Sequence, residues 1–331
     1  MDKIIALCVI VLISSCQKEE YFGPVNAADS AEIHTQTNAL LYIGCEGNFQ
    51  YSNASLSVLN LEEDRMENDV FSRANGFPVG DVLQSILHYG DSLFLVVNNS
   101  GLIRIVNDST FEQIATIEGF NSPRHMIMLD DKTAIVSDYG GQKLTIVDVA
   151  LAQITREVSS AQWTERMIIQ DGRLYVSNMT DSALLVYELP SLNMVSEIKL
   201  NIEPAYLFAS TESVLVVGNG RMGAQLLSSN QSNQFKVVQD FRRRISGAAI
   251  YESKVYILTN GSINQIDLNT ESVVSFDHSA QTPYSIFVDD YGIYISDVID
   301  YLSKGKVLKY EHDFSFEKSY DTGLIPQAFL R

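Results

Sequence analysis

The chain repeats one short segment about every 40 residues, and this repeat constrains its fold more than any other feature. The clearest copy is 121–129, in which Pro123 follows two polar residues and opens a run typical of a β-strand. With Pro123 as the reference position, the copies align at 83, 123, 164, 204, 246, 283 and 326. Such a period, carrying short apolar strands and turn residues, is typical of a β-propeller blade. Seven copies therefore predict seven blades.

Each repeat contains four short strands. In the repeat that follows Pro123, the expected strands are 124–129, 133–137, 143–148 and 154–158. Alternating and β-branched apolar residues, bounded by Asp, Gly and Asn, are typical of an antiparallel strand meander. The sequence therefore predicts an all-β fold, a seven-bladed β-propeller with four-stranded antiparallel blades.

The first blade lacks one strand. Its expected strands are 40–45, 55–60 and 66–71, and nothing before Asn38 resembles an inner strand. The missing copy is the last one, Gln327–Arg331. A C-terminal strand that completes the first blade would close the ring and cover two sheet edges.

The N-terminus resembles a bacterial lipoprotein signal. The apolar run 4–13 is too short to span a bilayer, and it ends in small residues directly before Cys16. We expect 1–15 to be a signal peptide, Cys16 to carry the lipid, 16–37 to be a tether and 38–331 to be the propeller. The segment 17–20, which contains Lys18, Glu19 and Glu20, resembles the surface-export signal of some Gram-negative lipoproteins. An ordinary secretory signal that is cleaved nearby is the alternative.

Composition limits the possible partners. The formal net charge of −18 disfavours nucleic acid and other polyanions. Because Cys8 would be removed with the signal peptide and Cys16 would be lipidated, only Cys45 would keep a free thiol, so the mature chain cannot form an internal disulfide. The five histidines show no metal-ligand spacing. We predict no metal and no bound cofactor.

The meander predicts where a ligand would bind. The start of each first strand and the end of each second strand lie at the same edge of a blade, around the mouth of the central channel. Residues just after the reference positions give the candidates Gln84, Arg124, Glu165, Tyr284 and Gln327. Second-strand ends give Asn98, Asp138, Asn178, Asn260 and Asp297, and the aromatic candidates are Tyr139 and Trp163.

Each group has a structural alternative. Asn and Asp at strand ends commonly cap their own turns. Trp163 is equally well explained by packing within or between blades. Turn geometry does not require Gln, Arg or Glu at the start of an inner strand, so a ligand role is favoured most for Gln84, Arg124 and Glu165.

The segment 134–148 resembles a repeat of the YVTN, or YncE-like, propellers. Other segments are similar to cell-surface lipoprotein propellers of gut anaerobes, of which the cobalamin-capturing BtuG type is best understood; they are 46–49, 53–57, 75–81, 96–101, 122–124 and 163–165. This resemblance implies a surface protein that captures a cobalamin-like ligand for a TonB-dependent outer-membrane transporter. The segments 221–225 and 242–244 depart from the pattern.

Three functions remain open at this stage. The first is a lipid-anchored binding protein that captures a small nutrient or cofactor at the channel mouth. The second is a metal-dependent lactonase, in which Glu165, Asp138, Asn178 and Asp297 would surround a divalent cation. The third is an adhesion or assembly scaffold that uses the blade edges.

Overall fold

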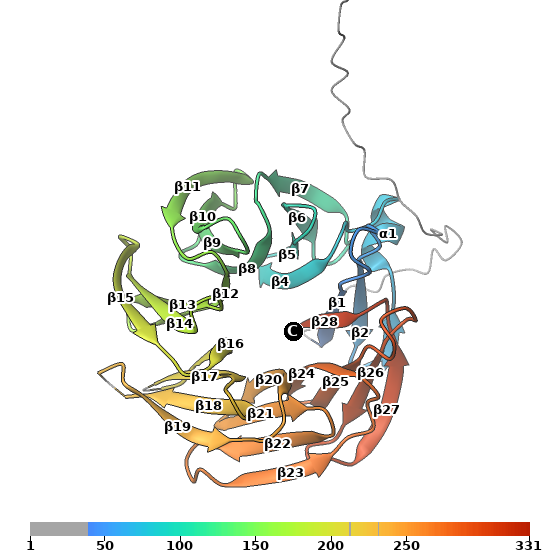
Figure 1. Cartoon of the computed structure of the whole chain (residues 1–331). Helices are drawn as coiled ribbons and strands as arrows, with labels where there is room; N and C mark the ends of the chain where they lie inside the picture. The colour runs from blue at the N-terminus through green and yellow to red at the C-terminus, as the bar shows by residue number, and fades with distance from the viewer. Residues whose placement is uncertain (1–38, 212, 231) are drawn as a thin grey trace, which may run out of the picture.

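Seven four-stranded antiparallel sheets form a ring around a central channel, as predicted (Figure 1). The computed structural model describes residues 39–211, 213–230 and 232–331. The predicted signal peptide, the tether and the lipidated Cys16 lie outside these residues.

Each blade contributes one strand to each of four concentric layers. The inner strands are β28 (Pro326–Leu330), β4 (Leu83–Tyr89), β8 (Pro123–Met128), β12 (Thr164–Gln170), β16 (Glu203–Ala209), β20 (Ile245–Tyr251) and β24 (Pro283–Asp289). The second strands are β1 (Leu40–Cys45), β5 (Ser92–Val97), β9 (Thr133–Asp138), β13 (Arg173–Asn178), β17 (Val214–Asn219), β21 (Lys254–Thr259) and β25 (Gly292–Asp297). The third strands are β2 (Ser55–Asn60), β6 (Leu102–Asn107), β10 (Lys143–Asp148), β14 (Ala183–Glu188), β18 (Ala224–Ser229), β22 (Ser262–Asp267) and β26 (Lys306–Tyr310). The outer strands are β3 (Arg65–Glu67), β7 (Gln113–Glu118), β11 (Gln153–Ser159), β15 (Asn193–Lys199), β19 (Phe235–Asp240), β23 (Val273–Asp277) and β27 (Phe316–Asp321).

The C-terminal strand closes the ring. β28 pairs with β1 in antiparallel register, with Ile43 opposite Phe329 and Gly44 opposite Ala328. Figure 1 places the C-terminus at the centre of the ring, beside β1. The predicted closure is therefore confirmed, and the first blade is built from both ends of the propeller.

The hydrophobic core lies between neighbouring blades. The segment Leu93–Val97 of β5 is almost completely buried, whereas most residues of the outer strand β15 are exposed. A middle strand is covered by a blade on each face, so its sequence is apolar throughout rather than alternating. This arrangement gives the channel a rigid wall.

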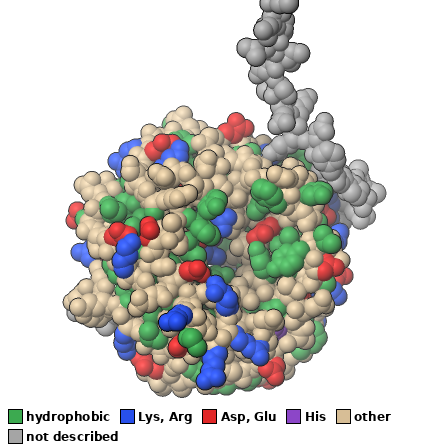
Figure 2. Space-filling model, in the orientation of Figure 1, with side chains coloured by type: hydrophobic (Ala, Val, Ile, Leu, Met, Phe, Trp, Pro, Cys, Tyr) green, Lys and Arg blue, Asp and Glu red, His purple; other side chains and the backbone are tan. Residues whose placement is uncertain are grey.

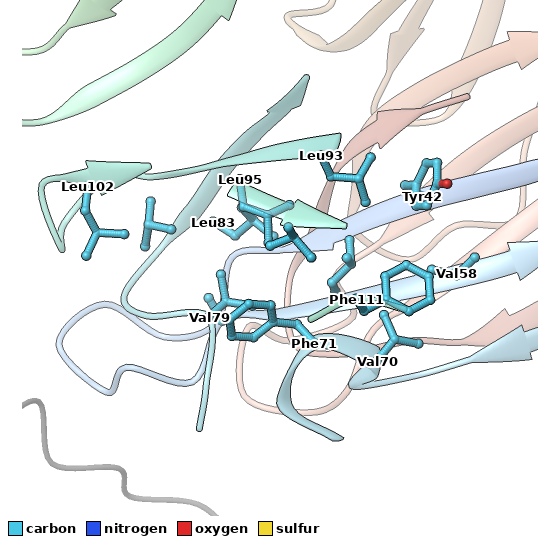
Figure 3. Close-up of a cluster of buried hydrophobic side chains, with 14 residues drawn as sticks. Tyr42, Val58, Val70, Phe71, Val79, Leu83, Leu93, Leu95, Leu102 and Phe111 are labelled. Atoms are coloured by element: carbon cyan, nitrogen blue, oxygen red, sulfur yellow. The ribbon is translucent and has the colours of Figure 1, made fainter. Parts of the chain in front are cut away.

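The first blade differs from the prediction in its outer strand. The expected strand 66–71 is only β3, and a short helix, α1 (Val70–Asn75), follows it. The helix buries both Val70 and Phe71, which pack beside Leu83 and Phe111 between two blades (Figure 3). A strand would point these two neighbours to opposite faces, which is why the helix fills this gap better.

Every inner strand carries a β-bulge directly after its start. In β4, Leu83 pairs with Val97 and Ser85 pairs with Val96, which leaves Gln84 outside the ladder. The same irregularity recurs in the other six inner strands, at Arg124–His125, Glu165–Arg166, Ala205, Ser246, Tyr284 and Gln327. A bulge re-aims the side chain of the extra residue. The repeat thus presents seven positions at the channel mouth.

One reference position was misaligned. In the blade of β20, Ile245 pairs with Thr259 and Gly247 pairs with Leu258, so the bulged residue is Ser246 and not Gly247. Gly247 has a different role, since a β-carbon there would lie 3.0 Å from Ser285 Cα and from the Ile286 nitrogen. The glycine lets β20 and β24 approach each other closely.

Candidate functional site at the channel mouth

Arg124 joins three successive blades at the mouth of the channel. Its Nε donates to Glu165 Oε2 at 2.8 Å and its Nη2 donates to Glu165 Oε1 at 2.9 Å. Its Nη1 donates to Gln84 Oε1 at 2.6 Å. Bidentate pairing of a guanidinium with a carboxylate is among the strongest side-chain interactions. Three of the predicted site residues therefore meet, and they bind one another.

Glu165 is the most heavily engaged carboxylate of this network. It is 8% exposed, and its Oε2 also accepts a hydrogen bond of 2.8 Å from Trp163 Nε1. Burial alone would raise the pKa of Glu165, but its hydrogen bonds and the Arg124 charge hold that pKa below the usual range. Glu165 is therefore ionised at neutral pH, and Trp163 serves to orient it.

His125 lies beside this carboxylate as a neutral side chain. Its Nε2 is 3.4 Å from Glu165 Oε1 and makes no hydrogen bond. Burial lowers the pKa of His125 to about 4, and the positive charge of Arg166 acts in the same direction. Because His125 is uncharged at neutral pH, Arg124 supplies the positive charge that holds Glu165 ionised.

Glu46 is a mouth residue that the sequence prediction did not include. The hydroxyl of Tyr284 donates to Glu46 Oε1 at 3.3 Å. Burial raises the pKa of Glu46 to about 7, although the nearby Arg124 charge opposes this. Glu46 follows β1 as Asn98 follows β5, so the same alignment of second strands could have identified it.

The predicted Asp residues at the strand ends are engaged in turns. Asp138 Oδ2 accepts the backbone N–H groups of Asn121 and Ser122, at 3.2 and 3.0 Å. Asp297 does the same for Gln281 and Thr282, at 2.8 and 2.7 Å. These carboxylates hold the loops that shape the mouth.

The predicted Asn residues have similar surroundings. Asn178 Nδ2 donates to Asp181 within its own turn at 2.9 Å, and Asn98 Nδ2 donates to the Pro123 carbonyl of the next blade at 3.1 Å. Asn260 is exposed, and its backbone carbonyl accepts a hydrogen bond from Arg243. Contact of these three residues with a ligand stays a prediction.

Exposed apolar side chains gather on one side of the mouth. The loop after β1 presents Phe49 and Tyr51, which are 61% and 58% exposed, and the loop after β25 presents Tyr301 and Leu302, which are 46% and 80% exposed. Asn48 Nδ2 donates to the Tyr301 carbonyl at 2.8 Å and so joins the two loops. We call these four residues the rim patch. Figure 2 shows hydrophobic atoms gathered beside the central hollow, over β28 and β2.

Other aromatic residues extend this surface. Tyr139 packs edge-to-face against Trp163, with 5.1 Å between ring centroids, and Tyr284 packs in the same way against Tyr301 at 6.2 Å. The first pair joins two predicted site residues, and the second joins the predicted Tyr284 to Tyr301 of the rim patch. The rim patch itself was not predicted. Aromatic residues in two unusually long inter-strand loops were the available signal.

A cavity of about 250 Å³ lies within the channel, and all seven inner strands line it. Gln84 and Gln327, both predicted, contribute to its wall, as does Tyr206, and Arg166 is a further contributor that was not predicted. The bulged positions of β16 and β20 carry the small residues Ala205 and Ser246, and residues that follow them, among them Phe208 and Ala248, line the cavity.

Two further features, a membrane-spanning helix and a cluster of metal ligands, are absent from the described part of the chain. Its helices include none long and apolar enough to cross a membrane. Within the same residues, no three His, Cys, Asp or Glu side chains are grouped to hold a metal ion. Glu165 is paired with Arg124, while Asp138 and Asp297 hold turns, so these carboxylates are already engaged.

Comparison with known proteins supports the fold but identifies no family. No family model matches the chain, and no curated protein matches it. A protein from Lactobacillus plantarum has a TM-score of 0.67 at 10% identity, covering 88% of this chain and 99% of its own. A quinonprotein alcohol dehydrogenase-like protein from Bacteroides thetaiotaomicron has a TM-score of 0.65 at 13% identity, with 87% and 77% covered. A putative 6-phosphogluconolactonase from Bacteroides fragilis has a TM-score of 0.65 at 9% identity, with 90% and 100% covered. At these identities the likeness extends to the propeller fold alone.

Proposed function

We propose that this protein captures a small organic molecule at the mouth of the propeller channel. The observation that carries the proposal is the rim patch, an exposed apolar surface held beside a polar channel mouth by loops on a rigid ring. Ligand sites typically combine apolar walls with a few fixed polar groups, and loops on a rigid scaffold are their usual location. Exposed apolar patches on soluble domains commonly mark binding sites.

A cobalamin-like molecule is the ligand that we favour, because of the resemblance to the BtuG-type propellers. The aromatic rings of the rim patch suit the apolar face of a corrin. A cavity of about 250 Å³ lies below the usual range of about 300–1,000 Å³ for pockets that bind drug-sized ligands. A corrin would therefore lie across the mouth against the rim patch rather than inside the channel.

The cellular setting is part of the same proposal. A lipid on Cys16 would anchor the protein in the outer membrane, exposed at the cell surface, where it would deliver its ligand to a TonB-dependent transporter. Two acyl chains suffice for stable anchoring. Changing Cys16→Ala should therefore move the protein from the membrane fraction to the soluble fraction of cells. Unchanged membrane partition would contradict the anchor.

A thermal-shift screen of the full-length chain with cobalamins, haem and glycans tests the binding function. A ligand present at a hundred times its Kd stabilises the folded state by about 2.7 kcal/mol, which raises the melting temperature measurably. Tyr51→Ala and Tyr301→Ala should weaken the binding of the ligand found, and should leave the melting temperature of the free protein nearly unchanged.

Met194→Ala and Leu151→Ala are the matched controls. Both residues are exposed and apolar, but they lie on an outer strand and in an outer turn, away from the channel mouth. These changes should leave affinity unaltered. Equal losses in the rim variants and in the controls would place the binding surface elsewhere.

A further inference from the structure

Two arginines of neighbouring bulges differ in their partners. Arg124 uses three of its nitrogens on Glu165 and Gln84. Arg166 follows Glu165 in the next bulge and lines the channel cavity, yet within the described residues its guanidinium forms no ion pair with a carboxylate. A guanidinium that lines a cavity without a counter-charge has hydrogen-bonding capacity available for a ligand.

Arg166 is held in a defined position. Its guanidinium carbon lies 4.9 Å from the centroid of the Tyr206 ring. Its backbone N–H donates to Ser177 Oγ at 2.9 Å, and that hydroxyl also donates to the Arg166 carbonyl at 3.3 Å. The contact with the Tyr206 ring restrains the guanidinium. The side chain is therefore held in place at the cavity wall, where its guanidinium can donate hydrogen bonds to a ligand.

The cavity wall offers a second polar group that lacks a partner. Gln327 Oε1 is buried without a hydrogen bond, and Gln327 lines the same cavity from β28. A buried amide that is left unsatisfied costs free energy, and a bound polar group can recover it. Rotation of the amide by 180° presents either a donor or an acceptor.

Towards the later residues of the inner strands the wall becomes apolar. Phe208, Ile250, Phe287 and Phe329 line that part of the cavity. An apolar cavity of about 150 Å³ is known to hold a benzene ring. At about 250 Å³, this cavity has room for one ring with a short polar arm.

We propose that the channel cavity is a binding site for a small carboxylate with an apolar body, such as a single-ring aromatic acid. The carboxylate would accept hydrogen bonds from the edge of Arg166, with Gln327 as a further contact, and the ring would lie among the apolar side chains. This site is separate from the rim patch, so binding in the cavity can be tested independently of binding at the mouth.

Calorimetric or NMR titration of the full-length chain with phenylacetate and with its neutral isostere phenylacetamide tests the site. A lost charge-assisted hydrogen bond typically lowers affinity tenfold or more. Phenylacetate should therefore bind at least about tenfold more tightly than phenylacetamide. Arg166→Gln should reduce phenylacetate binding to the level of the amide, while Arg166→Lys should keep part of the difference.

Arg173→Gln is the matched control, since Arg173 is an exposed arginine at the far end of the same blade. This variant should bind phenylacetate as the parent does, and so should Tyr301→Ala, which alters only the rim patch. The proposal is overturned if the acid and the amide bind equally, if neither binds, or if Arg166→Gln leaves phenylacetate affinity unchanged.

Discussion

The channel ring has a paired half and an open half, although both are built on the same bulge. On β4, β8 and β12 the bulges carry Gln84, Arg124 and Glu165, which bind one another across the three blades. On β16 and β20 the corresponding bulges carry the small residues Ala205 and Ser246, which form no such network, and residues that follow them, among them Tyr206 and Ala248, line the cavity. The same backbone bulge thus carries a connected polar network where its side chains are long and complementary, and leaves the channel mouth without such a network where they are small.

This difference changes the role of the strongest sequence candidates. Arg124 and Glu165 were predicted as ligand contacts because turn geometry does not require them. The structure pairs them with each other, and Glu165 is 8% exposed. We now expect changes at this pair to lower the stability of the fold, with any effect on binding following from that loss. Arg166 and Gln327 are better placed to contact a ligand.

The largest expected effect is the loss of stability when the C-terminal strand that closes the ring is removed. Deleting 327–331 removes most of β28, its pairing with β1 and the packing of Phe329 against Phe287. Burying an apolar side chain is worth about 1.5–3 kcal/mol, so the loss should reach about 3–6 kcal/mol in chemical denaturation. Removing Arg331 alone breaks its ion pairs with Asp289 and Asp290 but leaves the pairing of β28 with β1 in place, so it should cost less than the deletion of 327–331. Equal stability of the two truncated chains would show that the ring is closed by other contacts.

The next prediction concerns the paired half. Glu165→Gln removes the buried carboxylate that pairs with the largely covered Arg124 guanidinium, and breaking a buried pair typically costs about 3–5 kcal/mol of unfolding free energy. The matched control is Glu203→Gln. Glu203 pairs with Arg244 across one blade period, but the two side chains are 52% and 69% exposed. An exposed pair is worth about 0–1 kcal/mol, so the control should unfold almost as the parent does. Similar losses in both variants would refute the distinction between buried and exposed pairs.

A smaller effect is expected from Glu46, which lies between the two halves. Its pKa is raised from 4.5 to about 7, so the folded state holds a proton that the unfolded state releases. The contribution of Glu46 to stability should therefore be lost as pH rises from about 4.5 to about 7. Each pKa unit corresponds to about 1.4 kcal/mol, which gives a total of roughly 1–3 kcal/mol.

His125 has the opposite pH dependence, so Glu46 must be measured by difference. The His125 pKa is lowered from 6.5 to about 4, and its contribution to stability is lost as pH falls through that range. Subtracting the stability of Glu46→Gln from that of the parent at each pH isolates the carboxyl. A difference that does not change between pH 4.5 and 7 would show that Glu46 is not desolvated at the mouth.

The smallest expected effect belongs to Arg166. Because it has no carboxylate partner among the described residues, Arg166→Gln should change the free energy of unfolding by less than about 1 kcal/mol. The same denaturation experiment on Arg124→Gln should show a loss several times larger. A severe loss in Arg166→Gln would mean that Arg166 stabilises the fold as Arg124 does.

The sequence predicted the architecture better than the chemistry of the site. The repeat period and the alternation of apolar residues were enough to predict seven blades. The missing inner strand of the first blade was enough to predict closure by β28, because the pairing of strands depends on these local patterns. They could not show that residues 40 and 41 apart bind each other, since Gln84, Arg124 and Glu165 meet only when three blades are placed in a ring. Arg166 was overlooked because the prediction took one residue after each reference position. In β12 the bulge leaves two successive residues, Glu165 and Arg166, outside the backbone pairing with β13. Val70 and Phe71 were misassigned because a short helix and a short strand have the same apolar pattern.

A crystal structure of the protein with phenylacetate bound tests the central claim most directly. The account predicts density in the channel cavity with the carboxylate at hydrogen-bonding distance from Arg166, the ring beside Phe208 and Phe287, and the Arg124–Glu165 pair intact. A ligand bound to Arg124 in place of Glu165, or density only outside the channel, would contradict the division of the ring into a paired scaffold and an open binding half.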